Sequence, residues 1–141
     1  MLIPDVNVLL NAFHSEAEDH APASKWLLAA GNGNEPVGIP PAVLLSFARI
    51  ATTYIRGVRL MTPEVALARC GELRRMPSYV PLTEGGEHWD IFTSLVVTTG
   101  ISGPRFTDAY LAAFAVENEA AFVTFDRGFA RFPGLEVLVP A

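Results

Sequence analysis

The opening stretch of the chain, residues 2–10, reads LIPDVNVLL and contains the pattern on which the fold depends. A short apolar run over residues 2–4 ends at Asp5, and the following residues, 6–13, are a predicted helix. A carboxylate that directly follows a buried strand points into the crevice where open α/β sheets bind their ligands. The start of the chain therefore predicts a strand, an acidic side chain at its carboxyl end and a helix that leads away from it.

Apolar segments alternate with helical segments along the rest of the chain. Pro41 suits the first position of a helix, where its missing N–H has no partner in any case, and Thr62 is placed to cap the next helix. Strands separated by helices imply the α/β class, with a mostly parallel central sheet flanked by helices in one domain, residues 1–141. The remaining expected strands are 37–40, 79–82, 121–125 and 135–139; the remaining expected helices are 23–30, 42–51, 63–75, 87–99 and 108–118, the last capped by Thr107.

The composition predicts exposed apolar surface that binds a partner. Half of the 141 residues are hydrophobic and the mean hydropathy is +0.31, which favours contact with a second copy or another protein. No apolar run approaches the roughly 18 residues of a membrane span. The N-terminus lacks the basic segment of a signal peptide, so a cytoplasmic location is expected. Cys70 is the only cysteine, which excludes an internal disulfide and a thiolate metal site.

The charge balance is acidic, with a net charge of -5 and a pI near 5.1. This argues against a protein that coats nucleic acid, which is normally basic. It does not exclude an enzyme that contacts RNA at one place, because bound metal ions supply positive charge there. Arginine accounts for nine of the ten basic residues, a bias that genomic base composition explains better than function does.

Three aspartates are the candidate catalytic and metal-binding residues: Asp5, Asp108 and Asp126. Each stands where an apolar segment meets a turn or a helix start. If they converge at one edge of the sheet, they form an oxygen-only site suited to Mg²⁺ or Mn²⁺, which indicates metal-dependent phosphate chemistry. Each also has an ordinary structural role open to it. Asp5 can cap a helix, Asp108 can stabilise a first helical turn, and Asp126 can belong to a turn over residues 125–128.

Two polar residues near these aspartates are candidates for holding the site in place. Asn7 can orient Asp5 or a metal-bound water, or it can be an exposed helix residue. Thr124 precedes Asp126 by two residues and can hydrogen-bond to a ligand from behind. We expect both side chains to support the aspartates rather than to act on the substrate directly.

Arg49 and Arg127 are the candidate RNA contacts. Arg127 follows Asp126, where it can reach a phosphate or pair with that carboxylate. Arg49 and Arg56 are seven residues apart, so they share a helix face if the helix continues beyond residue 51. An arginine pair on one face can follow an RNA backbone, although a solvated helix face is the more common reason for such spacing.

Three stretches together resemble the PIN-domain family, and in particular the VapC-type ribonuclease toxins. They are residues 2–10, residues 107–115 (TDAYLAAFA) and residues 122–129 (FVTFDRGF). The resemblance implies a PIN fold in which Asp5, Asp108 and Asp126 hold Mg²⁺ or Mn²⁺. It implies an endoribonuclease in which water attacks the phosphodiester and leaves a 5′-phosphate. It also implies a toxin that is neutralised by a cognate antitoxin protein. The surplus of hydrophobic residues fits both a groove for that antitoxin and a homodimer face.

One departure from the family pattern leaves alternatives open. Ser46, within residues 45–49 (LSFAR), stands where the family usually has a glutamate. A serine hydroxyl can hold a metal-bound water but adds no charge, so a catalytically impaired protein that acts through partner binding is the second hypothesis. The third is a phosphatase of the haloacid dehalogenase type, since Asp5-Val6-Asn7 resembles its nucleophile motif, with Asn7 in place of the second aspartate.

Overall fold

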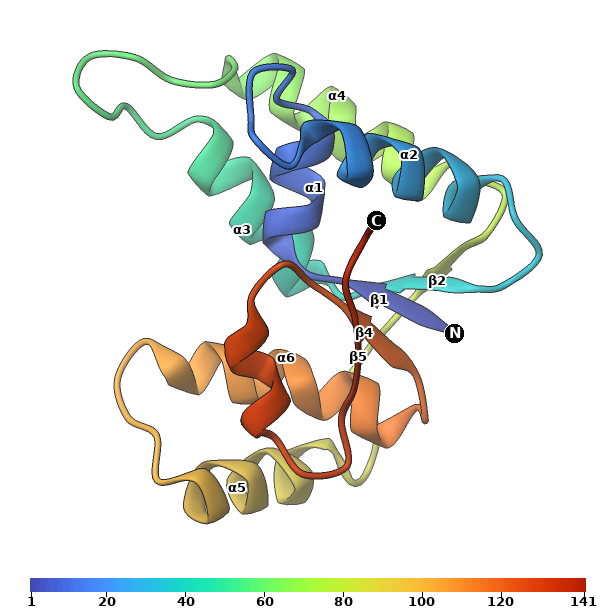
Figure 1. Ribbon diagram of the computed structural model, residues 1–141, viewed down its shortest axis with the longest axis vertical. Coiled ribbons are helices and arrows are strands. Elements are labelled where there is room, and N and C mark those ends of the chain that lie inside the picture. The colour runs from blue at the N-terminus through green and yellow to red at the C-terminus, as the bar shows by residue number, and fades with distance from the viewer.

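Strands and helices alternate along the chain in a computed structural model that describes all residues, 1–141 (Figure 1). The elements are β1 (Leu2–Pro4), α1 (Val6–Ala12), α2 (His20–Gly31), β2 (Val37–Ile39), α3 (Pro41–Ala51), α4 (Pro63–Arg74), β3 (Tyr79–Pro81), α5 (His88–Thr99), α6 (Arg105–Glu117), β4 (Ala121–Val123), the short 3₁₀ helix η1 (Arg127–Arg131) and β5 (Glu136–Leu138). The expected α/β class is confirmed, and Thr62 caps α4 as expected.

The five strands form a single sheet in the order β3-β2-β1-β4-β5. Every pairing is parallel, so the sheet is more uniform than the mostly parallel one expected. The chain adds strands on one side of β1 and then switches to the other side with β4. Ligands of α/β proteins bind at such a switch point, beyond the carboxyl ends of the strands. Pro4 of β1 is level with Val123 of β4, so Asp5 and Thr124 emerge side by side at this point.

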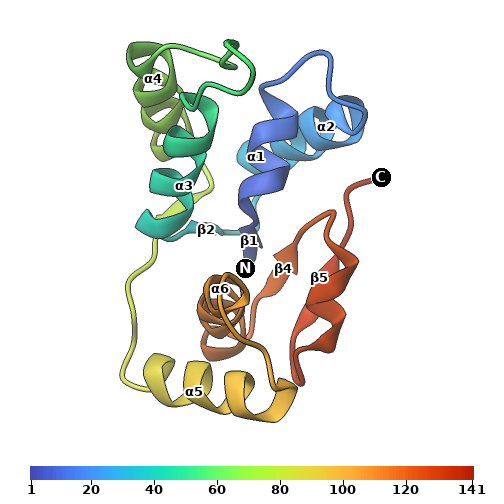
Figure 2. The same cartoon turned by 90° about the vertical axis from the view of Figure 1, so that its left-hand side faces the viewer.

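Helices cover both faces of the sheet. Figure 2 shows α1 to α4 on one side and α5 with α6 on the other. A sheet covered in this way buries its strands on both faces, and all residues of β2 and β4 are buried. None of the helices combines the length and the apolar character needed to cross a membrane.

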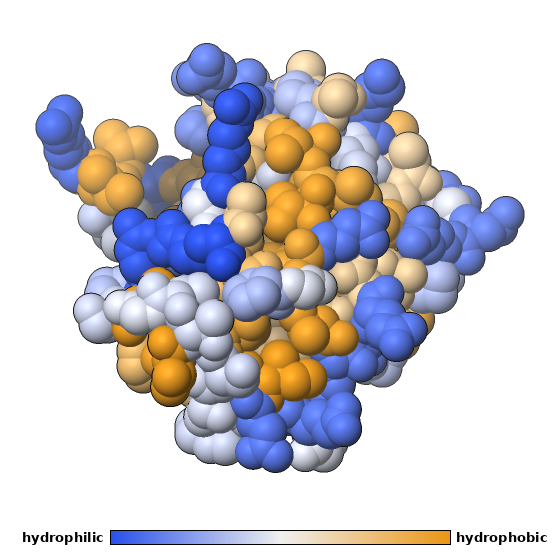
Figure 3. All heavy atoms as spheres, turned by 60° about the horizontal axis from the view of Figure 1, so that its bottom comes forward, coloured by the Kyte–Doolittle hydropathy of each residue, from blue (hydrophilic) through white to orange (hydrophobic).

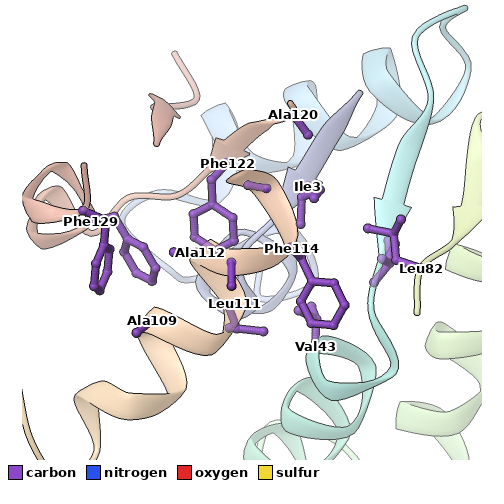
Figure 4. Packing of buried hydrophobic residues seen from close by; sticks show 14 of the residues in the cluster. Ile3, Val43, Leu82, Ala109, Leu111, Ala112, Phe114, Ala120, Phe122 and Phe129 are labelled. Carbon is purple, nitrogen blue, oxygen red and sulfur yellow. The ribbon is translucent and has the colours of Figure 1, made fainter. Parts of the chain in front are cut away.

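Large side chains from both helical layers meet the sheet in one core (Figure 4). Phe47 of α3, Phe114 of α6 and Phe122 of β4 are almost fully buried, each worth roughly 1.5–3 kcal/mol of transfer free energy. Buried alanines in α6, including Ala112 and Ala113, let this helix lie close against the sheet. The close approach of α6 brings its first turn, with Asp108, toward the switch point.

Two predicted helix starts are wrong. The last long helix begins at Arg105, after Pro104, so Thr107 lies inside the first turn and does not cap it. The second helix begins at His20 rather than residue 23. Pro22 is tolerated there because N–H groups in a first helical turn have no partner within the helix.

The structure also corrects the expected arginine pair. Helix α3 ends at Ala51, where the hydroxyl of Thr53 donates to the carbonyl of Arg49 at 2.6 Å and helps to satisfy the open helix end. Arg56 then adopts a left-handed conformation with φ of 53° in the following loop. Arg49 and Arg56 therefore do not share a helix face.

Candidate active site

Asp5 is the fixed point of the candidate site. Its side chain is only 7% exposed, and its backbone N–H donates to the carbonyl of Val123 at 2.8 Å. Oδ1 accepts the N–H of Val6 at 2.7 Å, which caps α1, and Oδ2 accepts from Thr124 at 2.6 Å and from Asn7 at 2.9 Å. A carboxylate has about four acceptor positions. Three are filled by the protein, which leaves one on Oδ1 for another donor or a cation.

Asn7 and Thr124 lock this carboxylate in place. The Asn7 amide donates to the Thr124 hydroxyl oxygen at 3.0 Å as well as to Asp5, and its carbonyl oxygen accepts the N–H of Phe125 at 3.2 Å. Thr124 is fully buried, and its hydroxyl oxygen also accepts the N–H of Asp126 at 3.0 Å. The network ties the end of β1 to the end of β4. Asn7 and Thr124 both donate to the Asp5 carboxylate, and their supporting roles in a reaction stay a prediction.

Asp126 and Asp108 are held much less tightly than Asp5. Asp126 is exposed and precedes η1, where its Oδ1 accepts the N–H of Gly128 at 2.8 Å. Asp108 is half-buried in the first turn of α6, and only burial and neighbouring charges act on its carboxyl. Asp126 thus also fills the turn role that its sequence position allows, whereas Asp108 lies in a first helical turn with no hydrogen bond to its carboxylate.

The three carboxylates lie close enough together to repel one another. Burial raises the pKa of Asp5, against the lowering effect of its hydrogen bonds from Thr124 and Val6, and repulsion by Asp108 and Asp126 raises it further. Burial and repulsion by Asp126 raise the pKa of Asp108. The structure thus gathers the three predicted aspartates into one field in which a negative charge is unfavourable. A cation placed among them would relieve this repulsion.

The donor set suits Mg²⁺ or Mn²⁺, because all of the nearby side-chain donors are oxygens. No three acidic, histidine or cysteine side chains come close enough together to form a finished coordination sphere. Mg²⁺ keeps several of its own waters and commonly uses one or two carboxylates directly, so it needs no closed protein cage. The residues fit an ion that is bound partly through water.

Two arginines that the sequence did not single out approach these carboxylates. Arg131 and Arg105 are the cations that lower the pKa of Asp108, with Arg131 the stronger of the two. Arg131 was missed because it belongs to η1, an element absent from the predicted set. The two predicted RNA contacts, Arg127 and Arg49, are both exposed, and neither is among the charges that act on Asp5 or Asp108.

Ser46 lies in the middle of α3 and is half-buried. The side chains that hydrogen-bond to Asp5 are Asn7 and Thr124, so Ser46 is not part of that network. The position expected to hold a fourth carboxylate therefore adds neither a charge nor a hydrogen bond to Asp5.

Comparison of the sequence with known proteins identifies the family of this chain. The PIN domain model matches residues 2–135. The VapC ribonuclease Mb2897 of Mycobacterium bovis is 36% identical over 132 residues, which are 94% of this chain and 90% of that protein. Ribonuclease VapC37 of Mycobacterium tuberculosis is 36% identical over 135 residues, 96% of this chain and 94% of that protein. The chain belongs to the VapC group of the PIN-domain family. This replaces the phosphatase hypothesis.

Solved structures agree on the fold of this PIN domain. VapBC2 from Rickettsia felis, bound to a DNA fragment from its promoter, matches with a TM-score of 0.70 and 15% identity over 99% of this chain and 98% of that chain. VapC20 of Mycobacterium tuberculosis, a sarcin-ricin loop cleaving toxin, matches with a TM-score of 0.70 and 14% identity over 96% of this chain and 99% of that chain. At such low identity the likeness is one of fold alone.

Proposed function

We propose that this PIN domain is the ribonuclease toxin of a toxin–antitoxin pair and that it hydrolyses RNA with the help of Mg²⁺ or Mn²⁺. One observation carries the proposal. At the switch point of the sheet, Asp5 is buried in a hydrogen-bond network with one acceptor position free, and it shares a repulsive field with Asp108 and Asp126. The family membership supports the choice of RNA as substrate, since the curated relatives are named ribonucleases.

Each residue has a distinct task in this proposal. Asp5 would hold the ion from the buried β1 end, and Asp108 and Asp126 would hold it from the more exposed side. Asn7 and Thr124 keep the Asp5 carboxylate in one orientation and add no ligand of their own. When bound, the divalent ion supplies the positive charge that makes water a better nucleophile and stabilises the phosphate during hydrolysis.

Cleavage of a structured RNA pool by the purified full chain tests this function. We expect cleavage with Mg²⁺ or Mn²⁺, none with EDTA, and products with 5′-phosphate ends. Asp108→Asn should abolish cleavage, while Asp90→Asn, which removes an exposed carboxylate on α5, should leave it intact. If the wild type binds Mn²⁺ in calorimetry but cleaves no RNA, the catalytically impaired alternative takes the place of this proposal.

The proposed antitoxin fits an apolar groove of about 410 Å³ between α1, α2 and the end of α4. Phe13, Leu27, Leu28 and Met76 are among its lining residues, and Leu28 is 70% exposed. One solved structure of the same fold is a toxin–antitoxin complex from Klebsiella pneumoniae. Leu28→Glu should abolish co-purification with the protein encoded beside this chain. Leu67→Glu, at an exposed site outside the groove, should not.

A homodimer is proposed through α5, where Trp89 is 62% exposed and Val97 is 81% exposed. Figure 3, in which the α5 end of the molecule comes forward, shows hydrophobic side chains exposed in patches between hydrophilic ones. An apolar helix face in this position favours pairing with an identical face, as in most homodimers. Val97→Glu should convert a dimer to a monomer in light scattering, and an unchanged mass would rule out this face.

A further inference from the structure

Gly128 brings an acidic and a basic side chain together without letting them pair. Its N–H donates to Asp126 Oδ1 at 2.8 Å, and its carbonyl accepts the Nε–H of Arg131 at 2.6 Å. A Cβ at this position would lie 2.9 Å from Asp126 Oδ1 and 2.5 Å from Arg131 Nη2. Because Gly128 has no side chain, Asp126 Oδ1 and the Arg131 guanidinium can both occupy the space beside its Cα.

The Arg131 guanidinium faces the acidic site and keeps most of its donors free. It is the cation that acts most strongly on Asp108, yet the only ion pairs within 4.0 Å in the chain are those of Met1 with Glu35 and Arg69 with Glu72. An arginine has five N–H donors, and Nε uses one of them on Gly128. The two terminal nitrogens remain available to an anion.

The segment that carries Arg131 is firmly anchored. Phe129 and Phe132, on either side of it, are 2% and 3% exposed, and their rings pack together with centroids 5.7 Å apart. The Arg131 guanidinium also lies 6.0 Å from the centroid of the Phe132 ring. A side chain held at both its backbone and its Nε loses less entropy on binding than a free surface arginine does.

We propose that Arg131 binds a backbone phosphate of the RNA next to the one that is cleaved. The planar guanidinium suits bidentate contact with phosphate oxygens, and its place beside Asp126 puts that phosphate at the edge of the metal site. The inference rests on the proposed ribonuclease function and adds a substrate-binding residue to it. The competing role for Arg131 is to offset the three negative charges without touching RNA.

Salt-dependent RNA binding separates these roles. The probe is a short mixed-sequence single-stranded RNA with Ca²⁺ in place of Mg²⁺, followed by fluorescence anisotropy over a KCl series. Loss of one phosphate contact lowers the slope of log affinity against log salt by about 0.7 for a single strand. We expect this change in Arg131→Gln, with about tenfold weaker binding. Arg131→Lys should restore the salt slope but only part of the RNA affinity, because lysine keeps the positive charge but cannot make the bidentate contact of a guanidinium.

Arg74→Gln is the matched control, because Arg74 is an exposed arginine at the end of α4 and its loss changes the net charge equally. It should leave the slope unchanged. Mn²⁺ affinity in calorimetry should not fall in Arg131→Gln, which separates RNA binding from loss of the metal site. An unchanged slope and RNA affinity in Arg131→Gln would overturn this inference alone. Absence of RNA binding and of cleavage by the wild type would overturn it together with the proposed function.

Discussion

The two sides of the site differ in how firmly they hold their carboxylates. On the β1 side, Asp5 is buried and accepts three hydrogen bonds. On the open side, Asp126 accepts one from Gly128, two residues further along, and Asp108 accepts none, so only burial and neighbouring charges act on its carboxyl. The β1 side is fixed by the fold before any ligand arrives. The open side can adjust to an ion and a substrate.

This difference separates stability from activity. Asp5 caps a helix and satisfies three donors, so the fold depends on it even without a metal. Asp108 raises the energy of the folded state, because burial and repulsion from Asp126 make its charged form unfavourable. Burial raises the pKa of Asp5 as well, so ionisation of either carboxylate costs folding stability at neutral pH. Asp5 differs because it also caps α1 and accepts three hydrogen bonds.

The largest expected effects come from removing one carboxylate on each side. Asp5→Ala and Asp126→Ala should each lower cleavage by more than about 100-fold, since losing even a group that orients a ligand costs roughly 10- to 100-fold. Asp5→Ala should also lower the free energy of unfolding by about 1–2 kcal/mol, because it removes the cap of α1 and leaves buried donors without an acceptor. Asp126→Ala should lower it less, because Asp126 is exposed and accepts only the N–H of Gly128. Urea titration of both variants measures this difference. Equal losses of stability would contradict the division of the site into a fixed and an open side.

A smaller effect is expected from Thr124→Val, which keeps the shape of the side chain. It removes the donor to Asp5 Oδ2 and the acceptor for the Asp126 N–H. Mn²⁺ affinity in calorimetry should fall by about 10- to 100-fold, as for other groups that orient a metal ligand. Thr124→Ser keeps the hydroxyl and should bind Mn²⁺ almost as the wild type does. If the two variants bind equally, the hydroxyl does not hold Asp5 for the ion.

On the open side, Asp108→Asn should raise the thermal midpoint in EDTA at neutral pH. The folded pKa of Asp108 is raised, so this group costs stability above that pKa and the cost vanishes as pH falls through it. The advantage of the variant should therefore shrink on acidification toward about pH 4, near the ordinary pKa of aspartate. Differential scanning calorimetry at several pH values checks this, with Asp90→Asn as the charge-matched control. An advantage that is independent of pH would contradict the repulsion.

The strands, the order of the helices and the positions of the three aspartates could be predicted from the sequence, because an acid that follows a strand end is a local pattern. The start of α6 could not be predicted. Pro104 precedes that helix and Thr107 falls inside it, whereas a threonine before an aspartate is a common capping signal. The error did not move Asp108 out of the first turn, so the expected position of the carboxylate at the helix start still held.

The arginines were harder to predict than the acids. Arg131 reaches the site through a five-residue 3₁₀ helix, which has no periodic signature long enough to detect, and through the space left by Gly128. Arg49 and Arg56 have a spacing that suits a helix, but α3 stops at Ala51. Side-chain direction in short, irregular segments depends on tertiary packing, which spacing along the chain does not report.

The smallest effect is expected at Ser46, where a substitution adds a negative charge near the aspartates rather than removing one. If this half-buried position on α3 faces the ion, Ser46→Glu adds a fourth carboxylate and should tighten Mn²⁺ binding by up to about tenfold, or roughly 1.4 kcal/mol. It should also lower the thermal midpoint in EDTA, because a further negative charge joins the repulsive field of Asp5 and Asp108. The outward-facing Leu45→Glu adds the same charge one residue away, at a side chain that is 70% exposed, and should change neither quantity as much. Calorimetry that finds equal Mn²⁺ affinity in the two variants would place Ser46 outside the site, and the ion would then depend on the three aspartates alone.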